Sequence, residues 1–190
     1  CTSAGTVRGL VRLAEGRDAP RQLNTLGDQA MLAMTIENPG LDPREPQRYQ
    51  SLINLDAVSL EGALEDYFRR SEQLPTRLLL TADGKGIAGL MLQKLPGDEG
   101  DSDGWNRACA LFDTLGHAEL ATTQAQTLLH RLFHEEAVEL LGNKPLRFAC
   151  SCSPERVRDM LQSLGQQEAL AAAQANDGEV EVRCEFCARE

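Results

Sequence analysis

The C-terminal part of the chain contains the cysteine pattern that decides how it folds. The first half reads Cys150-Ser-Cys152 and the second reads Cys184-Glu-Phe-Cys187, with 31 residues between the two. Thiolates in two tight pairs suit a tetrahedral zinc site, because each pair supplies two ligands about 2.3 Å from the metal. The pattern therefore predicts one zinc ion per chain, bound by all four cysteines.

The segment that carries these cysteines is too short to depend on an apolar core. Residues 150–190 number 41, close to the length of roughly 40 residues below which chains rarely fold without a metal or disulfides. Structural zinc contributes about 10–16 kcal/mol of apparent folding energy in small metal domains. We therefore expect residues 150–190 to form a small zinc domain whose folding depends on the metal.

Two other interpretations of the cysteines are weaker. Two structural disulfides would suit a secreted protein, but the chain opens at Cys1 with no visible secretory signal. A thioredoxin-like Cys-x-x-Cys motif should open a helix after a strand, whereas Cys187 lies three residues from the end of the sequence. The zinc site is preferred to both.

The charge distribution argues against nucleic acid as a partner. The formal charge is −10, of which residues 1–96 carry −1, residues 97–149 carry −5 and residues 150–190 carry −4. A nucleic-acid binder normally presents a basic stripe that releases counterions from the phosphates. No apolar run approaches the 18–20 residues of a membrane span. We expect a cytoplasmic protein that binds neither nucleic acid nor membrane.

The first half of the sequence predicts a mixed α+β core over residues 1–96. Short apolar or alternating runs bounded by turn residues predict strands at 6–13, 30–36, 49–55, 76–82 and 87–93. Ser59 is placed to cap a helix that Pro75 stops. The segment Gly84-Lys-Gly86-Ile-Ala-Gly89 matches a dinucleotide-binding pattern, but a strand follows it, so a hairpin turn is the better interpretation.

Residues 97–149 predict a partly helical linker. It begins with the acidic stretch 97–104, followed by helices at 105–114 and 123–136. The second helix carries an apolar stripe of Leu128, Leu129, Leu132 and Phe133. Runs at 137–141 and 146–150 predict a hairpin that delivers Cys150 to the end of a strand.

Within residues 150–190, local signals predict one further helix and one further strand. Ser153 and Pro154 mark the start of the helix and Gly165 its end, while Val180 and Val182 alternate with acids as in a strand. His130 and His134 lie four residues apart but do not form the H-E-x-x-H zinc pattern. Cys1 and Cys109 have no assigned role, and Cys109 reads as a small buried residue on a helix.

Several segments resemble the heat-shock protein 33 family, the redox-regulated holdase chaperones of bacteria. Besides the cysteines, the resemblance is carried by Tyr67-Phe-Arg-Arg-Ser-Glu-Gln-Leu-Pro-Thr76, Ala88-Gly-Leu-Met-Leu-Gln-Lys-Leu-Pro96, Arg131-Leu-Phe-His-Glu-Glu136 and Phe148-Ala-Cys-Ser-Cys-Ser-Pro-Glu-Arg156. The family's core begins upstream of Cys1, and its chain usually continues beyond the second cysteine pair. We therefore expect a fragment that lacks the N-terminal part of the core.

The resemblance implies an ATP-independent chaperone with no catalytic residues and no enzymatic turnover. The reduced, zinc-loaded protein would be an inactive monomer, and oxidation would convert it into a homodimer that holds unfolding client proteins and prevents their aggregation. Oxidation would pair Cys150 with Cys152 and Cys184 with Cys187 and eject zinc. The apolar linker helices would then leave their native contacts and meet clients.

Two rival functions stay open at this stage. A zinc-ribbon-type nucleic-acid-binding module would use the same four cysteines, although the acidic charge of residues 150–190 disfavours it. A dithiol oxidoreductase would use them for catalytic exchange.

Overall fold

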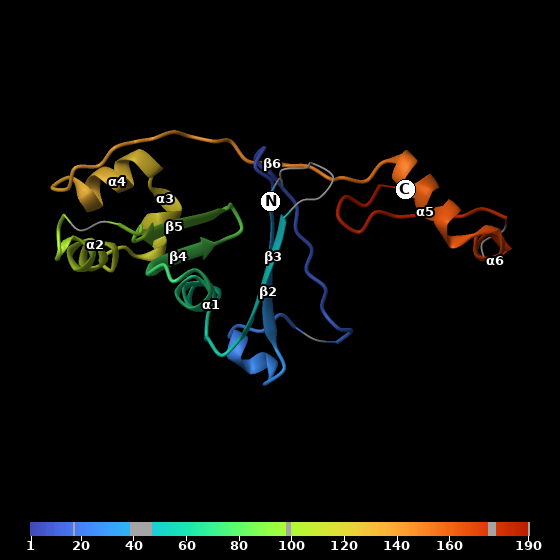
Figure 1. The fold of residues 1–190 in the computed structure, drawn as a ribbon, viewed down its shortest axis with the longest axis horizontal. Coiled ribbons are helices and arrows are strands. Elements are labelled where there is room, and N and C mark those ends of the chain that lie inside the picture. Colours follow the sequence, from blue (N-terminus) through green and yellow to red (C-terminus); the bar gives the residue numbers. More distant parts are fainter. Residues whose placement is uncertain (17, 39–46, 98–99, 175–177, 190) are drawn as a thin grey trace. The chain divides into compact units, whose positions relative to one another are not determined.

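The computed structural model describes residues 1–16, 18–38, 47–97, 100–174 and 178–189. The chain separates into two compact units, Asp18–Glu139 and a second unit made of Cys1–Arg17 together with Leu140–Glu190. Helices and small two-stranded sheets are mixed along the chain, as Figure 1 shows. The predicted α+β class is confirmed, while the division at residues 96 and 149 stays a prediction.

In the described part of the unit Asp18–Glu139, the strands form two antiparallel pairs. Strands β2 (Met31–Asn38) and β3 (Gln47–Asn54) pair from Met31↔Asn54 to Asn38↔Gln47. Strands β4 (Thr76–Ala82) and β5 (Ile87–Gln93) pair from Thr76↔Gln93 to Ala82↔Ile87. The strands predicted at 76–82 and 87–93 have the predicted bounds, and those at 30–36 and 49–55 are each displaced by one or two residues.

Local side-chain hydrogen bonds define the helix and the turn that flank β4. Helix α1 (Leu60–Tyr67) begins at Ser59, whose Oγ accepts a bond from the Gly62 N–H at 3.3 Å. It continues as a π-helical turn, Phe68–Glu72. In the β4–β5 turn, the Asp83 carboxylate accepts from the N–H groups of Lys85 and Gly86 at 2.7 and 2.9 Å. The glycine-rich segment is therefore a hairpin turn, as predicted.

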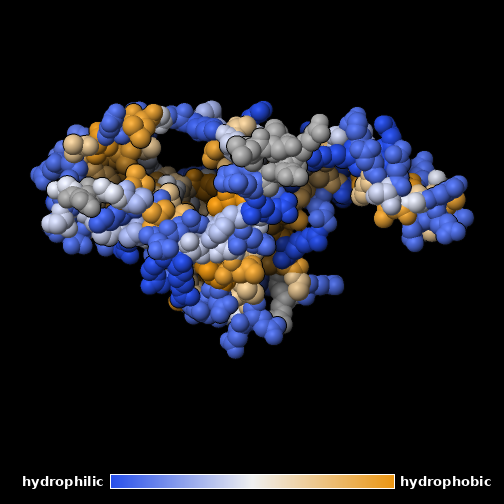
Figure 2. All heavy atoms as spheres, viewed as in Figure 1, coloured by the Kyte–Doolittle hydropathy of each residue, from blue (hydrophilic) through white to orange (hydrophobic). Residues whose placement is uncertain are grey.

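Three short helices complete this unit and form its core with the β4–β5 sheet. They are α2 (Gly104–Phe112), α3 (His117–Thr122), which was not predicted, and α4 (Ala125–Phe133). Helix α3 packs against β4 and β5, and α2 packs against α4. Figure 2 shows apolar residues gathered around α4 and the neighbouring sheet. The buried cluster consists of Leu115, Leu120, Leu128, Leu132 and Phe133, which confirms the apolar stripe of the second linker helix.

In the other unit, a strand near the start of the chain pairs with a strand just before the first cysteine pair. Strand β1 (Thr6–Val7) runs parallel to β6 (Arg147–Phe148). The predicted hairpin of 137–141 with 146–150 is therefore wrong, and the predicted strand at 6–13 is reduced to two residues. The reason lies in the backbone donors, because the N–H groups of Arg147 and Ala149 bond to the carbonyls of Gly5 and Val7 at 2.9 and 3.2 Å.

The described residues between 150 and 190 are mainly helical. Helix α5 (Pro154–Leu164) begins at Ser153, whose Oγ accepts from the Arg156 N–H at 3.3 Å, so this predicted helix is confirmed. Helix α6 (Gln166–Gln174) was not predicted. Val180 and Val182 lie in no strand, since no neighbouring strand pairs with them among the described residues, and that prediction is wrong.

No helix among the described residues is long and apolar enough to cross a bilayer. Of the acidic stretch 97–104, residues 98 and 99 lie outside the described part, while the Asp101 carboxylate accepts a hydrogen bond from Arg107 at 2.8 Å.

Candidate metal centre

The structure brings the four predicted ligands into one cluster. Their Sγ atoms all lie within 4.8 Å of one another, with Cys150 and Cys184 at 3.4 Å and Cys152 and Cys187 at 3.3 Å. All four cysteines are free thiols, and their sulfurs lie farther apart than the S–S bond length of about 2.05 Å in a disulfide. Four sulfurs bound at about 2.3 Å in a tetrahedron would lie about 3.8 Å apart. The donor set and its spacing therefore fit a single tetrahedral ion such as zinc.

Each cysteine pair is held by the backbone around it. Cys150 follows β6 by two residues, and Cys152 directly precedes the Ser153 cap of α5. In the second loop, the Cys184 N–H donates to the Arg189 carbonyl and the Ala188 N–H donates to the Cys184 carbonyl, both at 2.8 Å. The β1–β6 ladder, the α5 cap and this turn thus present the two pairs toward each other.

The electrostatics of the cluster favour thiolate on two of its sulfurs. The backbone N–H groups of Cys187 and Phe186 donate to the Cys184 sulfur and lower its pKa to about 6. The backbone N–H of Cys152 likewise lowers the pKa of Cys150. Contact with the Cys150 and Cys187 sulfurs raises the pKa of Cys152 to about 12. Because metals bind the thiolate form, the lowered pKa values of Cys150 and Cys184 favour these two residues as metal ligands.

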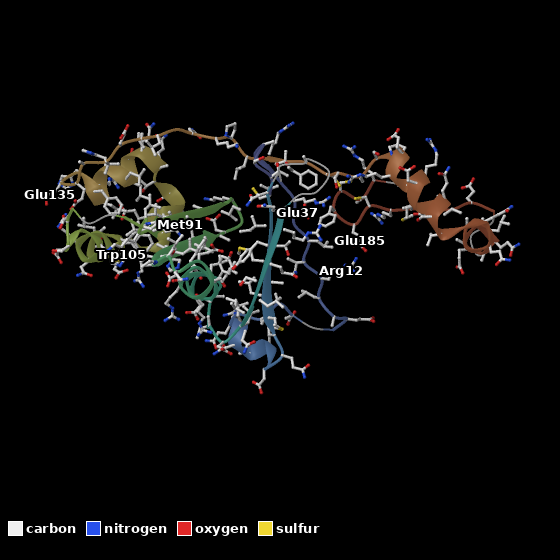
Figure 3. All side chains as sticks on the ribbon, viewed as in Figure 1. Arg12, Glu37, Met91, Trp105, Glu135 and Glu185 are labelled. Atoms are coloured by element: carbon white, nitrogen blue, oxygen red, sulfur yellow. The ribbon has the colours of Figure 1, made fainter. Side chains whose placement is uncertain are left out.

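Two arginines from the start of the chain contact the cysteine loops. Arg8 Nη1 donates to Ser151 Oγ at 2.5 Å, and its guanidinium lies 4.5 Å from the centre of the Phe186 ring. Arg12 forms an ion pair with Glu185 (Figure 3). Sequence reasoning missed these residues, because no local signal links positions more than 140 residues apart.

Other candidate residues lie outside this cluster. Among the described residues, the four cysteines are the only group of three or more potential ligands whose metal-binding atoms converge. The rings of His130, on α4, and His134, the residue that ends this helix, meet edge to face with their centres 5.9 Å apart. Cys109 lies on α2, half-buried rather than fully buried, and burial raises the pKa of its thiol. Cys1 is exposed.

Curated relatives of this chain share one name. The 33 kDa chaperonin of Ectopseudomonas mendocina is 43% identical over 193 residues, which cover 98% of this chain and 64% of the relative. The 33 kDa chaperonin of Azotobacter vinelandii is 44% identical and that of Hahella chejuensis is 42% identical, over 63% and 64% of their lengths. The chain thus spans slightly less than two thirds of these relatives.

A solved structure and a family model agree with this result. The crystal structure of the 33 kDa chaperonin from Thermotoga maritima superposes with a TM-score of 0.74 at 22% identity, covering 100% of this chain and 66% of that one, which shows a shared fold. The family model described as Hsp33 protein matches residues 1–190. The chain belongs to the Hsp33 family.

Proposed function

We propose that this chain is part of a redox-regulated, ATP-independent holdase chaperone whose switch is a zinc-bound cluster of four cysteines. The observation that carries the proposal is the convergence of Cys150, Cys152, Cys184 and Cys187 in a unit whose described residues bury no apolar side chain. In such a unit the metal supplies the energy that an apolar core supplies elsewhere. Bound zinc would keep the four sulfurs as thiolates and join the two cysteine loops.

Oxidation would remove the ligands. Cys150 pairs with Cys152, and Cys184 pairs with Cys187. For each disulfide, two thiolates lose two electrons to one peroxide molecule, whose O–O bond breaks to give two hydroxide ions that take protons from the solvent and become two waters. The nearest sulfurs in the cluster belong to different loops, so pairing within each loop requires the sulfurs to leave these contacts. Because the disulfides consume the thiolates that bind the metal, disulfide formation and loss of the metal site are coupled.

Loss of the folded site would free the linker and expose client-binding surface. Residues 140–149 belong to the same unit as the cysteines, and they continue directly from the segment that carries α4. Leu128, Leu132 and Phe133, now buried, are candidate contacts for unfolding clients once that segment loosens. The oxidised protein acts as a homodimer in the cytoplasm and holds clients stoichiometrically, without turnover and without nucleic acid.

The test is zinc content followed by client aggregation. Reduced protein should contain about one zinc per chain, and peroxide should release it as four thiols disappear. The oxidised protein should then suppress the aggregation of a heat-unfolded client at stoichiometric ratio. Cys109→Ser serves as the matched control and should behave like the wild type, whereas Cys152→Ser should lose the switch.

Two results would contradict the proposal. Zinc that stays bound under oxidant would indicate a purely structural site. Repeated turnover in insulin reduction, with no protection of clients, would indicate a dithiol oxidoreductase.

A further inference from the structure

The side chain of Arg8 bridges the two cysteine loops. Its guanidinium donates to Ser151, the residue between Cys150 and Cys152, at 2.5 Å. The same group lies over the ring of Phe186, the residue before Cys187, at 4.5 Å from the ring centre. One cation therefore contacts both cysteine loops, although Arg8 is not itself one of the candidate metal ligands.

The position of Arg8 is set by the β1–β6 ladder. Arg8 directly follows β1, whose residue Val7 pairs with Phe148, two residues before Cys150. Gly5 is buried at the start of this ladder with φ of 75°, and a Cβ at this position would lie 2.7 Å from the Pro145 carbonyl oxygen. Only glycine fits such a contact in this backbone conformation. The start of the chain is thus fitted closely to the strand that leads into the site.

The positive charge of Arg8 complements the negative charge of a metal site made of four thiolates. Four thiolates around a divalent ion carry a net charge of −2, and Arg8 places a cation beside the two loops that hold them. Arg12 adds an ion pair with Glu185 in the second loop. That pair is largely exposed, with 66% and 58% of the two side chains accessible, so it contributes little alone. The flat guanidinium of Arg8 gains from stacking as well as from charge.

We propose that Arg8, supported by Arg12, is a positioning residue that clamps the two cysteine loops together and so strengthens metal binding and slows its oxidative loss. The inference rests on the proposed function only in that the cluster binds zinc. The clamp acts by holding the loops near each other before the metal enters, which lowers the ordering cost of binding.

The test is a zinc-affinity measurement on the reduced full chain by competition with a chromophoric chelator. Arg8→Ala should weaken zinc binding about tenfold, as expected for a lost cation–π contact and hydrogen bond. Arg12→Ala should weaken it about twofold. Arg158→Ala, on α5 of the same unit, is the matched control and should leave the affinity unchanged. Peroxide should release zinc faster from Arg8→Ala than from the wild type.

A double-mutant cycle separates a clamp from a general loss of stability. Arg8→Ala and Phe186→Leu should be strongly non-additive in zinc affinity, because each removes the same contact. Arg158→Ala and Phe186→Leu should be additive. Arg8→Lys should fall between wild type and Arg8→Ala, since it keeps the charge but not the flat stacking group.

A second pair of variants tests whether the close fit of Gly5 against the β1–β6 ladder is needed to place Arg8. Gly5→Ala should weaken zinc binding, whereas Gly16→Ala should not, although both glycines have positive φ, because only Gly5 has a backbone atom in the way. Wild-type affinity in Arg8→Ala, or additivity in the Arg8–Phe186 cycle, would overturn the clamp while leaving the zinc switch intact. Absence of zinc from the wild type would instead overturn the proposed function.

Discussion

The two units of this chain are held together in different ways. Every buried hydrophobic side chain among the described residues belongs to Asp18–Glu139, including Tyr67 at 1% exposure and Leu128 at 3%. The unit that contains the cysteines leaves Val11 81% exposed and Leu141 90% exposed. The surface over α5 and α6 is mostly hydrophilic (Figure 2). One unit has an apolar core, whereas we propose that the other depends on metal binding by four sulfurs and on a short strand ladder.

Under the proposed function, this difference makes the unit with the four cysteines the more sensitive of the two to peroxide. Peroxide does not remove the aliphatic and aromatic contacts of the core cluster, whereas it removes the thiolates of a metal site. The redox signal would therefore act on the unit that has no buried apolar core among its described residues.

The largest effect should come from removing a metal ligand. Cys184→Ser should weaken zinc binding by at least about a hundredfold, because serine does not supply a thiolate to the tetrahedral set. Cys109→Ser changes a half-buried cysteine of the core unit and should leave zinc affinity as it is. Competition with a chelator measures both variants, and full zinc affinity in Cys184→Ser would contradict the assigned ligand set.

The next effect concerns the apolar core. Leu128→Ala should destabilise the unit Asp18–Glu139 by about 2–5 kcal/mol, since Leu128 is buried in the Leu115–Phe133 cluster. Urea unfolding followed by the fluorescence of Trp105, the one tryptophan, reports on this unit. Leu164→Ala, at a position 54% exposed on α5, should change this transition little. A large loss of zinc affinity in Leu128→Ala would show that the two units do not fold independently.

Acid should also separate the units. The folded pKa of Cys184 is about 6, below the ordinary value of about 8.5. The stability that the Cys184 thiolate contributes to the folded unit is therefore complete above about pH 8.5 and is lost as pH falls through about 6. Apparent zinc affinity should fall by up to about tenfold per pH unit for each proton taken up. A chelator titration from pH 8 to pH 5 measures this loss, while Trp105 fluorescence should stay constant. Equal zinc affinity at both ends of the range would contradict it.

The smallest effect compares the same cap in the two units. Ser59→Ala and Ser153→Ala each remove a helix N-cap bond of 3.3 Å, worth about 1 kcal/mol. Ser59→Ala should appear as reduced urea stability of the core unit. Ser153→Ala should appear as zinc binding weakened by about fivefold, because folding and metal binding are linked there. If both variants changed only urea stability, the linkage would be absent.

Local sequence signals predicted the elements that local interactions define. The caps Ser59 and Ser153 mark the helix starts, and the Asp83 turn joins strands with the predicted bounds. The four cysteines were also found from spacing alone, because each pair is compact and distinctive. Where a capping or turn side chain marks the boundary of an element, the pattern was sufficient.

Apart from the two short helices that were not predicted, α3 and α6, the failures involve partners that are distant in sequence. Arg147–Phe148 looked like one arm of a hairpin, but its strand partner is Thr6–Val7. Val180 and Val182 alternate as in a strand, yet no strand lies beside them among the described residues. Arg8 reaches Ser151 across 143 positions. Pairings of this kind are decided by packing in space, which one sequence does not display.

We propose that metal binding folds the unit with the four cysteines, whereas an apolar core folds Asp18–Glu139. Hydrogen exchange by mass spectrometry, on the reduced full chain with zinc and after its removal by a chelator, distinguishes the two sources of stability. Zinc removal should abolish protection in β6 and α5 and leave β4, β5 and α4 protected. Protection that persists in α5 without zinc would show that this helix does not depend on the metal. Protection that disappears equally from β4 and β5 would show that the two units are not stabilised separately.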